Sequence, residues 1–316
     1  APTASTPSTH VTGLAASGRS PANISPTTTT PMLSPQSSCR TVCAAVLAST
    51  FLAADAASQI GPAFAGDYTF SELPPVPGVP LPLGGMVFKA GAPDTLLIIG
   101  ASNAPASAIY EIDVTRDANG HVNGFVGQPS MLSTSTYGDG GLSYGPGGVL
   151  FFTQYNSPAD SIGQIEPGST TPDRLDTVTS LTGNPWSSGG VAVVPPGFPG
   201  AGQFKFTDYE ENWYDATLVP DGMGTFDYSN PQFRTSISAN VLDCASFIFV
   251  DSTYPGINTW SVVMSEYTTQ AVSVMELDGN GDVIPSTRRI LLSGEPFLGT
   301  ALDPVSGDFL VGDWSG

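Results

Sequence analysis

The sequence predicts an all-β fold, and more narrowly a β-propeller of five blades, each about 50 residues long. Two observations carry this prediction. A pair of small residues that leads into an apolar strand recurs at steps of about 50 residues, at Gly84-Gly85, Gly140-Gly141, Gly189-Gly190, Cys244-Ala245 and Gly299-Thr300. In addition, 36 glycines and 29 prolines among 316 residues would interrupt long helices repeatedly.

Each repeat unit also carries a tight-turn signal at nearly the same distance from its start. The signals are Asp117-Ala118-Asn119-Gly120, Pro172-Asp173, Asp221-Gly222 and Asp278-Gly279-Asn280-Gly281. Asp, Asn and Gly suit hairpins because they tolerate positive φ and hydrogen-bond their own backbone. We therefore expect a turn between the third and fourth strands of each blade. The segment 278–282 resembles a calcium loop, but Arg289 stands where a bidentate Glu is required, which favours a hairpin.

Runs rich in Val, Ile, Phe and Tyr indicate the individual strands. In the second unit the strands are expected at residues 142–144, 149–153, 161–165 and 175–181. The third unit inserts residues 195–200 between its first two strands, and the fourth inserts residues 252–258 at the same place. Six blades would require a degenerate unit within residues 66–84. The last blade reaches Gly316 and reads as truncated, unless residues 68–73 supply a strand and close the ring.

The first 65 residues do not follow the repeat. Residues 1–31 are rich in Ser, Thr and Pro, which predicts a disordered leader. Residues 32–65 resemble a secretory signal peptide, with one basic residue, an apolar run at 42–54 and small-residue cleavage signals at 54–56 and 63–65. That run is too short to span a bilayer comfortably. The sequence thus predicts an exported propeller domain over residues 66–316 without a permanent membrane anchor. The alternative is that the N-terminal region is a low-complexity tail and not an export signal.

Charge and the shortage of reactive side chains limit the possible functions. Nine Lys and Arg against 28 Asp and Glu give a net charge of −19, which repels nucleic acid and anionic membranes and attracts cations or basic partners. An acidic secreted or salt-adapted protein would carry a similar charge. Beyond residue 65 the chain keeps a single histidine, His121, and a single cysteine, Cys244. A Ser-His-Asp or Cys-His nucleophile is therefore not expected, and Cys244 is predicted to be a small core residue that begins an inner strand.

An acidic or amide residue followed by an aromatic recurs just after the second strand of successive units. These pairs are Gln154-Tyr155, Asp208-Tyr209, Glu266-Tyr267 and Asp313-Trp314, and we expect them to ring one mouth of the central channel together with Asp139, Asp243 and Glu295. Converging oxygen ligands would suit Ca²⁺, which makes Gln154, Asp208, Glu266 and Asp313 candidate metal ligands. A bound cation could polarise a lactone or ester carbonyl. Alternatively, each acidic residue caps backbone amides and each aromatic packs between blades.

Several phrases in the second half of the chain resemble secreted bacterial proteins that carry a PEP-CTERM sorting signal. They are residues 194–205, 212–215, 219–222, 265–267, 276–282 and 302–310. This resemblance implies a propeller that is exported, handled by an exosortase and delivered to the cell surface or extracellular matrix. The Pro-Glu-Pro motif itself is not among the 316 residues.

A more distant likeness, carried by residues 141–153, is to NHL-type and gluconolactonase-like propellers. The lactonase branch implies a metal held by Glu, Asn and Asp in the channel, for which Glu266, Asp208 and Asp313 are the matching positions. The expected function is a non-enzymatic binding or structural module at the bacterial cell surface or matrix. Its partner would be an extracellular polysaccharide or a surface protein. The alternative is a Ca²⁺-dependent hydrolase resembling a lactonase or esterase, with its site at the channel mouth.

Overall fold

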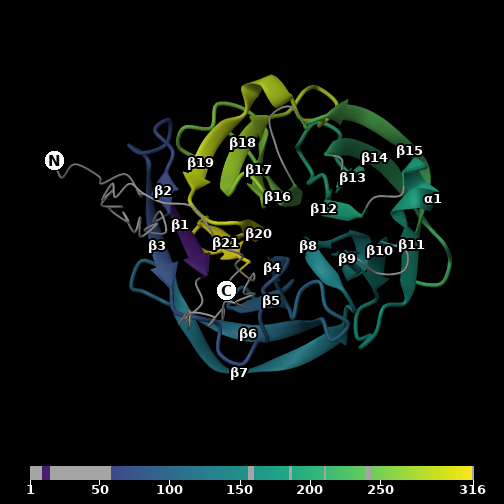
Figure 1. Cartoon of the computed structure of the whole chain (residues 1–316), viewed down its shortest axis with the longest axis horizontal. Coiled ribbons are helices and arrows are strands. Elements are labelled where there is room, and N and C mark those ends of the chain that lie inside the picture. Colours follow the sequence, from purple (N-terminus) through teal and green to yellow (C-terminus); the bar gives the residue numbers. More distant parts are fainter. Residues whose placement is uncertain are drawn as a thin grey trace, which may run out of the picture.

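The structure is a computed structural model that describes residues 9–14, 58–155, 160–184, 187–209, 211–238 and 243–314. Its strands form five sheets arranged in a ring (Figure 1). The first strand of each repeat unit lies innermost, and these strands contact one another in the order β4, β8, β12, β16 and β20, with β20 returning to β4. The predicted all-β propeller is confirmed.

Four of the sheets are blades of the regular type, each an antiparallel meander of four consecutive strands. The first contains β4 (Met86–Phe88), β5 (Thr95–Gly100), β6 (Ala108–Arg116) and β7 (Val122–Thr134). The second contains β8 (Gly138–Tyr144), β9 (Leu150–Gln154), β10 (Ser161–Ile165) and β11 (Arg174–Thr177). The third contains β12 (Ser188–Val193), β13 (Phe204–Asp208), β14 (Asn212–Pro220) and β15 (Phe226–Ser236). The fourth contains β16 (Cys244–Val250), β17 (Ser261–Glu266), β18 (Ala271–Glu276) and β19 (Arg289–Ser293), and β2 (Gln59–Ile60) adds an outer fifth strand.

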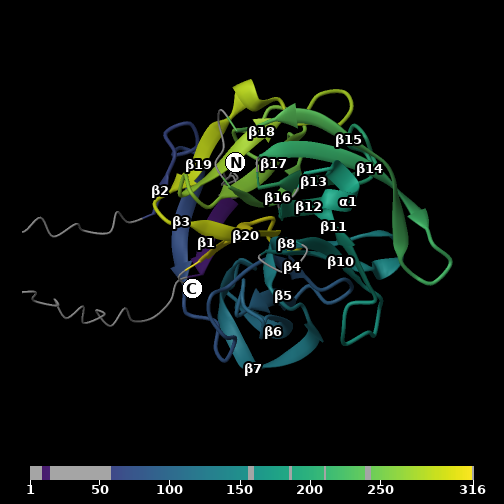
Figure 2. The same cartoon turned by 45° about the vertical axis from the view of Figure 1, so that its right-hand side comes forward.

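The remaining sheet is composite. Only β20 (Phe297–Leu302) and β21 (Phe309–Asp313) come from the repeat, and β1 (Thr9–Leu14) and β3 (Tyr68–Leu73) complete it (Figure 1 and Figure 2). β1 lies between β21 and β3 and is parallel to both. The prediction of five or six repeated blades is corrected accordingly: four regular blades are present, and strands from both ends of the chain close the ring. The suggested closing strand at residues 68–73 is confirmed, although it joins through β1.

Two predictions about the N-terminal segments need correction. Residues 9–14 were assigned to a disordered leader, but β1 buries Val11 and Thr12 and pairs the edges that β21 and β3 would otherwise leave open. Composition cannot reveal such an edge. The folded part also begins before residue 66, because Phe64 is fully buried and packs edge-on against Tyr68 at 5.7 Å. The cleavage signal at 63–65 therefore lies inside the folded domain, and the rest of the proposed signal peptide lies outside the described residues.

Close backbone approach at the centre of the ring explains the repeated small pairs. A Cβ atom on Gly189 would lie 1.8 Å from the carbonyl oxygen of Cys244, and one on Gly84 would lie 2.6 Å from that of Asp139. On Gly299, a Cβ atom would lie 2.3 Å from the Gly84 carbonyl oxygen. Such distances are below van der Waals contact, so these positions must lack a side chain. The repeated small residues therefore mark inner strands whose backbones are in direct contact.

The predicted strands and turns agree well with the structure, with one local difference. The Asp117, Asp173, Asp221 and Asp278 turns all connect third and fourth strands. Residues 175–181, expected as one strand, divide into β11 and the short helix α1 (Val178–Thr182). The Thr177 side chain caps α1 by accepting a hydrogen bond from the Ser180 amide at 3.2 Å, and Gly183 ends the helix with φ of 79°.

Apolar side chains fill the spaces between neighbouring sheets. Between the first and second blades, for example, Ile99 packs with Leu142 and Phe152, and between the second and third blades the rings of Phe151 and Phe204 lie 5.0 Å apart. Each blade is therefore stabilised mainly by burial against its neighbours. Among the described residues, no helix has the length and apolar character that crossing a bilayer requires.

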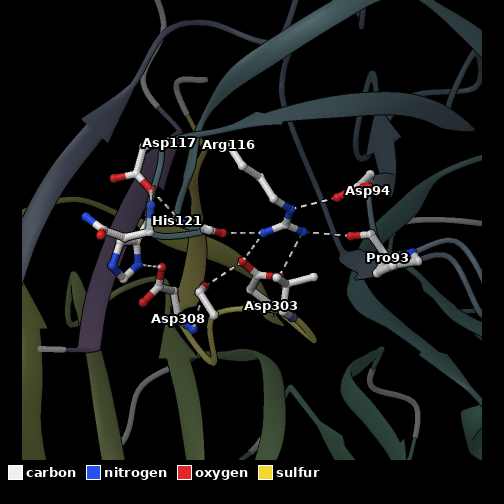
Figure 3. Close-up of polar contacts among 11 residues, drawn as sticks. Pro93, Asp94, Arg116, Asp117, His121, Asp303 and Asp308 are labelled. Carbon is white, nitrogen blue, oxygen red and sulfur yellow. Dashed lines mark hydrogen bonds and ion pairs between the residues drawn. The ribbon is translucent and has the colours of Figure 1, made fainter. Parts of the chain in front are cut away.

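Charged contacts connect the hairpin turns to adjacent sheets. At the ring closure, Arg116 donates two hydrogen bonds to Asp303, at 2.6 and 3.0 Å, and His121 lies 2.6 Å from Asp308 through Nδ1 (Figure 3). Between the third and fourth blades, the buried Nζ of Lys205 lies 2.6 Å from Asp282. Asp282 therefore belongs to an ion pair, and Asp278 accepts two turn amides, which confirms the hairpin at 278–282.

Candidate functional site

A cavity of about 340 Å³ opens where the inner strands begin. All five sheets or their connecting loops contribute side chains to it, so it lies over the centre of the ring. Its size falls at the lower end of the range for small-molecule sites, about 300–1,000 Å³. We refer to it as the mouth cavity, and its walls contain the aromatic residues Tyr155, Tyr209, Tyr267 and Trp314, the carboxylates Asp139 and Asp243, and Asn103, Ser188, Thr268, Cys244 and Leu298.

The four aromatic side chains form two pairs. The rings of Tyr155 and Tyr209 lie 5.9 Å apart and are tilted by 41°, and those of Tyr267 and Trp314 lie 5.7 Å apart and are nearly perpendicular. Tyr209 keeps 43% of its surface exposed. The prediction that the aromatic residues after the second strands ring the mouth is therefore confirmed, and they offer several π-faces to a ligand.

Two carboxylates enter the same cavity, Asp139 from the start of β8 and Asp243 from the loop that precedes β16. Burial raises the pKa of Asp139 to about 7, a shift that the hydrogen bond from Asn103 opposes and that the charges of Asp243 and Asp160 reinforce. Asp243 accepts a hydrogen bond from the Thr268 hydroxyl. Its charge is also the largest cause of the raised pKa of Tyr209. The cavity therefore concentrates negative charge. Asp139 and Asp243 lie at the mouth as predicted, whereas Glu295 is not among the residues of the cavity wall.

A further acidic group lies behind the wall. Glu211 is 5% exposed, and one of its carboxylate oxygens accepts the Asp243 amide at 3.0 Å. Its other oxygen is buried and has no hydrogen-bond partner among the described residues. Burial, followed by the charges of Asp243, Glu266 and Asp208, raises the pKa of Glu211 to about 7. Protons are thus bound more tightly here because burial disfavours the ionised carboxylate and the neighbouring negative charges add to that effect.

Two polar groups of the wall have unused hydrogen-bonding capacity. The Ser188 hydroxyl belongs to a residue that is 1% exposed, and neither it nor the Asn103 Oδ1 has a partner among the described residues. Buried polar atoms are normally satisfied, so these two are available to a ligand. Cys244 is also buried here, as predicted, and burial raises the pKa of its thiol to about 12. Its thiol is therefore protonated and unreactive at neutral pH.

The predicted metal ligands do not reach the mouth cavity. Asp208 accepts hydrogen bonds from the Tyr214 hydroxyl at 2.8 Å and from the Asn212 amide at 3.0 Å. Glu266 forms a bidentate pair with Arg288, with Nε donating at 2.8 Å and Nη2 at 2.5 Å. Both carboxylates are at most 1% exposed. Their charges are therefore committed within and behind the blades.

The amide and the last carboxylate of the predicted set are also placed elsewhere. Gln154 donates through Nε2 to the Thr136 carbonyl oxygen at 2.6 Å, and Asp313 ends β21 outside the cavity wall. Over the described ranges, no three or more His, Cys, Asp or Glu side chains come close enough together to hold a metal ion. The residues present do not fit the predicted Ca²⁺ site at Gln154, Asp208, Glu266 and Asp313.

Strand geometry explains this separation. Each acidic or amide residue is the last residue of its strand, and the aromatic that follows it lies just beyond the strand end, in the cavity wall. The wall also contains the residue before four of the five small pairs, namely Asp139, Ser188, Asp243 and Leu298. Ser188 was missed because a lone serine carries no charge signal, although the repeat phase could have identified it.

Comparisons with known proteins give a likeness of overall shape only. No family model and no curated protein sequence matches the chain. An auxiliary nutrient binding protein from Bacteroides thetaiotaomicron is similar with a TM-score of 0.44 and 14% identity, over 74% of this chain and 57% of that one. A candidate gluconolactonase is similar with a TM-score of 0.35 and 14% identity, over 67% of this chain and 69% of that one.

A β-propeller domain from Myceliophteria thermophila has a TM-score of 0.39 and 11% identity, over 71% of this chain and 64% of that domain. The chain thus spans little more than half the length of the nutrient binding protein, 57%. The propeller architecture rests on the sheet order itself, and the mouth cavity rests on the residues of its walls.

Proposed function

We propose that this protein is a binding module whose ligand site is the mouth cavity. The observation that carries the proposal is the wall itself, which combines four aromatic side chains, two carboxylates and a serine hydroxyl that has no partner among the described residues. Small-molecule sites combine apolar and aromatic surface, which supplies affinity, with a few polar groups, which fix orientation. The mouth cavity has this composition, and five sheets hold its residues in place.

The contacts of the inward carboxylates favour binding over metal-dependent hydrolysis. For Asp208 and Glu266 to hold Ca²⁺ in the cavity, they would have to leave the Tyr214 hydroxyl and the Arg288 guanidinium without their partners. Separating a buried ion pair is strongly unfavourable. The hydrolase alternative therefore requires a rearrangement that the binding proposal does not.

We further propose that the protein acts at the bacterial cell surface or in the extracellular matrix, where an extracellular polysaccharide or a surface protein would be its partner. The apolar run at residues 42–54 and the high acidic charge support export. Cleavage at 54–56 or at 63–65 would remove β1, which pairs with β21 and β3, so the exported protein is expected to keep residues 9–14. Mass spectrometry of tryptic peptides from protein recovered outside the cell should therefore detect residues 9–14, and recovery only from the cytoplasm would contradict export.

Ligand binding is tested with three small probes of different charge: methyl glucoside, choline and butyrate. Saturation-transfer NMR should show binding of at least one probe to the full chain. Tyr209→Ala should abolish that signal, because Tyr209 presents an exposed ring in the cavity. Phe233→Ala is the matched control, since Phe233 is 56% exposed on β15 and outside the cavity wall. Failure of all three probes, or equal loss in both variants, would contradict the proposal.

A further inference from the structure

The charges around the mouth cavity are unbalanced. Asp139 and Asp243 are part of the wall, and none of the described residues that line the cavity is basic. Arg288, the cation that contacts Glu266, is already engaged in a bidentate pair with that carboxylate. The whole chain adds to the effect with its net charge of −19. A ligand that enters the cavity therefore meets a negative potential with no local counter-charge.

The pKa values of groups at and behind the cavity wall indicate the same excess of negative charge, and they do so independently of the shape of the cavity. Asp139 and Glu211 both have their pKa raised to about 7, and in both cases neighbouring carboxylates add to the effect of burial. The Tyr209 hydroxyl holds its proton more tightly chiefly because of Asp243. Each of these groups would be stabilised in its ionised or hydrogen-bonded form by a positive charge placed in the cavity.

The aromatic residues indicate what kind of cation would fit. A hard metal ion needs several converging oxygen ligands, and the described residues do not assemble such a group. Four aromatic side chains and two carboxylates in one wall are instead an environment that suits an organic ammonium, since aromatic ring faces attract positive charge. The Ser188 hydroxyl and Asn103 Oδ1, which have no partner among the described residues, can accept hydrogen bonds from polar substituents of such a ligand.

We infer that the mouth cavity selects a small organic cation, an alkylated or primary ammonium compound, held between the four aromatic rings and the carboxylates of Asp139 and Asp243. The inference rests on the proposed binding function and names its ligand class. The aromatic faces contact the alkyl groups around the nitrogen, and the carboxylates supply the opposite charge. A neutral sugar could use the same rings, but it would leave the excess negative charge of the cavity uncompensated.

The test compares choline with dimethylbutanol, in which a carbon atom replaces the positively charged nitrogen and the shape is kept. Isothermal titration calorimetry of the full chain should show at least about tenfold tighter binding of choline, because a desolvated cation on aromatic faces contributes about 2 kcal/mol. Asp243→Asn should weaken choline binding about tenfold while leaving the binding of dimethylbutanol unchanged. Asp113→Asn, the same charge change at an exposed position on β6, should alter neither.

The possible outcomes separate this inference from the proposed function. Equal affinity for choline and its neutral isostere, or an effect of Asp113→Asn as large as that of Asp243→Asn, would overturn the cation inference. Binding of methyl glucoside alone, lost in Tyr209→Ala, would also overturn it while supporting a ligand site at the mouth. If choline, its isostere, methyl glucoside and butyrate all fail to bind, the proposed function fails together with the inference.

Discussion

Replacing Arg116 with Met tests how the ring is closed. Arg116 ends β6, and its guanidinium joins the first blade to the composite sheet through Asp303, while it also donates to Asp94 and the Pro93 carbonyl oxygen within the first blade (Figure 3). The Asp303 side chain has no exposed surface and that of Arg116 has 14%, whereas the Asp94 side chain is 68% exposed. The contact with Asp303 should therefore account for most of the effect.

The magnitude follows from what Asp303 would lose. Removing one partner of a buried ion pair costs about 3–5 kcal/mol, because the remaining charge is left uncompensated. Asp303 would keep hydrogen bonds from the Val305 amide at 3.0 Å and the Ser306 hydroxyl at 2.6 Å. These bonds place the expected loss at the lower end, about 3 kcal/mol. For a domain of this size that corresponds to a fall in Tm of about 10 °C.

Urea denaturation followed by circular dichroism measures the free energy of unfolding of Arg116→Met and wild type. Lys89→Met is the control, because Lys89 pairs with Glu111 at 2.5 Å while 38% of its side chain is exposed. An exposed pair of this kind contributes about 0–1 kcal/mol. If Arg116→Met loses no more stability than Lys89→Met, the closing contact does not hold the ring as described.

Three further changes test other parts of the account. Lys205→Met leaves Asp282 and Asp215 with only the partly exposed Arg234 as a cation and should cost about 3 kcal/mol in urea denaturation; a loss below about 1 kcal/mol would refute the pairing. Val11→Asp places a charge where β1 is fully buried and should lower stability by about 3 kcal/mol or more, whereas no change would show that β1 does not belong to the sheet. Burial raises the pKa of Asp139 to about 7, and the groups around this carboxyl are Asn103, Asp243 and Asp160. Its ionisation therefore opposes folding, so the free energy of unfolding of the wild type should fall as pH rises from about 4 to about 7. Asp139→Asn should therefore gain stability relative to wild type on going from about pH 5 to about pH 8, and a constant difference would contradict the shift.

The repeat made the regular blades predictable, because the same physical constraint recurs in each. Inner strands such as β12 and β16 meet backbone to backbone, so Gly189 must lack a side chain, and that requirement is written directly into the sequence. The turns at Asp221 and Asp278 were predictable because hairpins need residues that bond their own backbone. Local rules of this kind need no knowledge of the tertiary structure.

The composite sheet was harder to predict from the sequence, because it forms by pairing of strands that lie far apart in the chain. Val11 is buried only because β21 and β3 present open edges on both sides of β1, and a window of sequence rich in Ser and Thr gives no sign of them. Phe64 was likewise interpreted as part of a cleavage signal. In the structure it packs edge-on against Tyr68, and its ring centroid lies 4.9 Å from the guanidinium carbon of Arg289.

For the candidate site, the sequence located the mouth correctly and assigned its ligands to the wrong face. Tyr209 and Tyr267 lie in the cavity wall, but the preceding Asp208 and Glu266 end their strands and are buried within the protein. The partners that hold them, Tyr214 and Arg288, come from other strands and turns, so their pairing could not be read from spacing alone.

The most direct test of the central claim is a crystal structure of the full chain grown with choline. The account predicts electron density for the ammonium group among the rings of Tyr155, Tyr209, Tyr267 and Trp314, on the side where Asp139 and Asp243 enter the cavity. Choline found elsewhere on the surface, or a mouth cavity that holds only water at saturating choline, would contradict it.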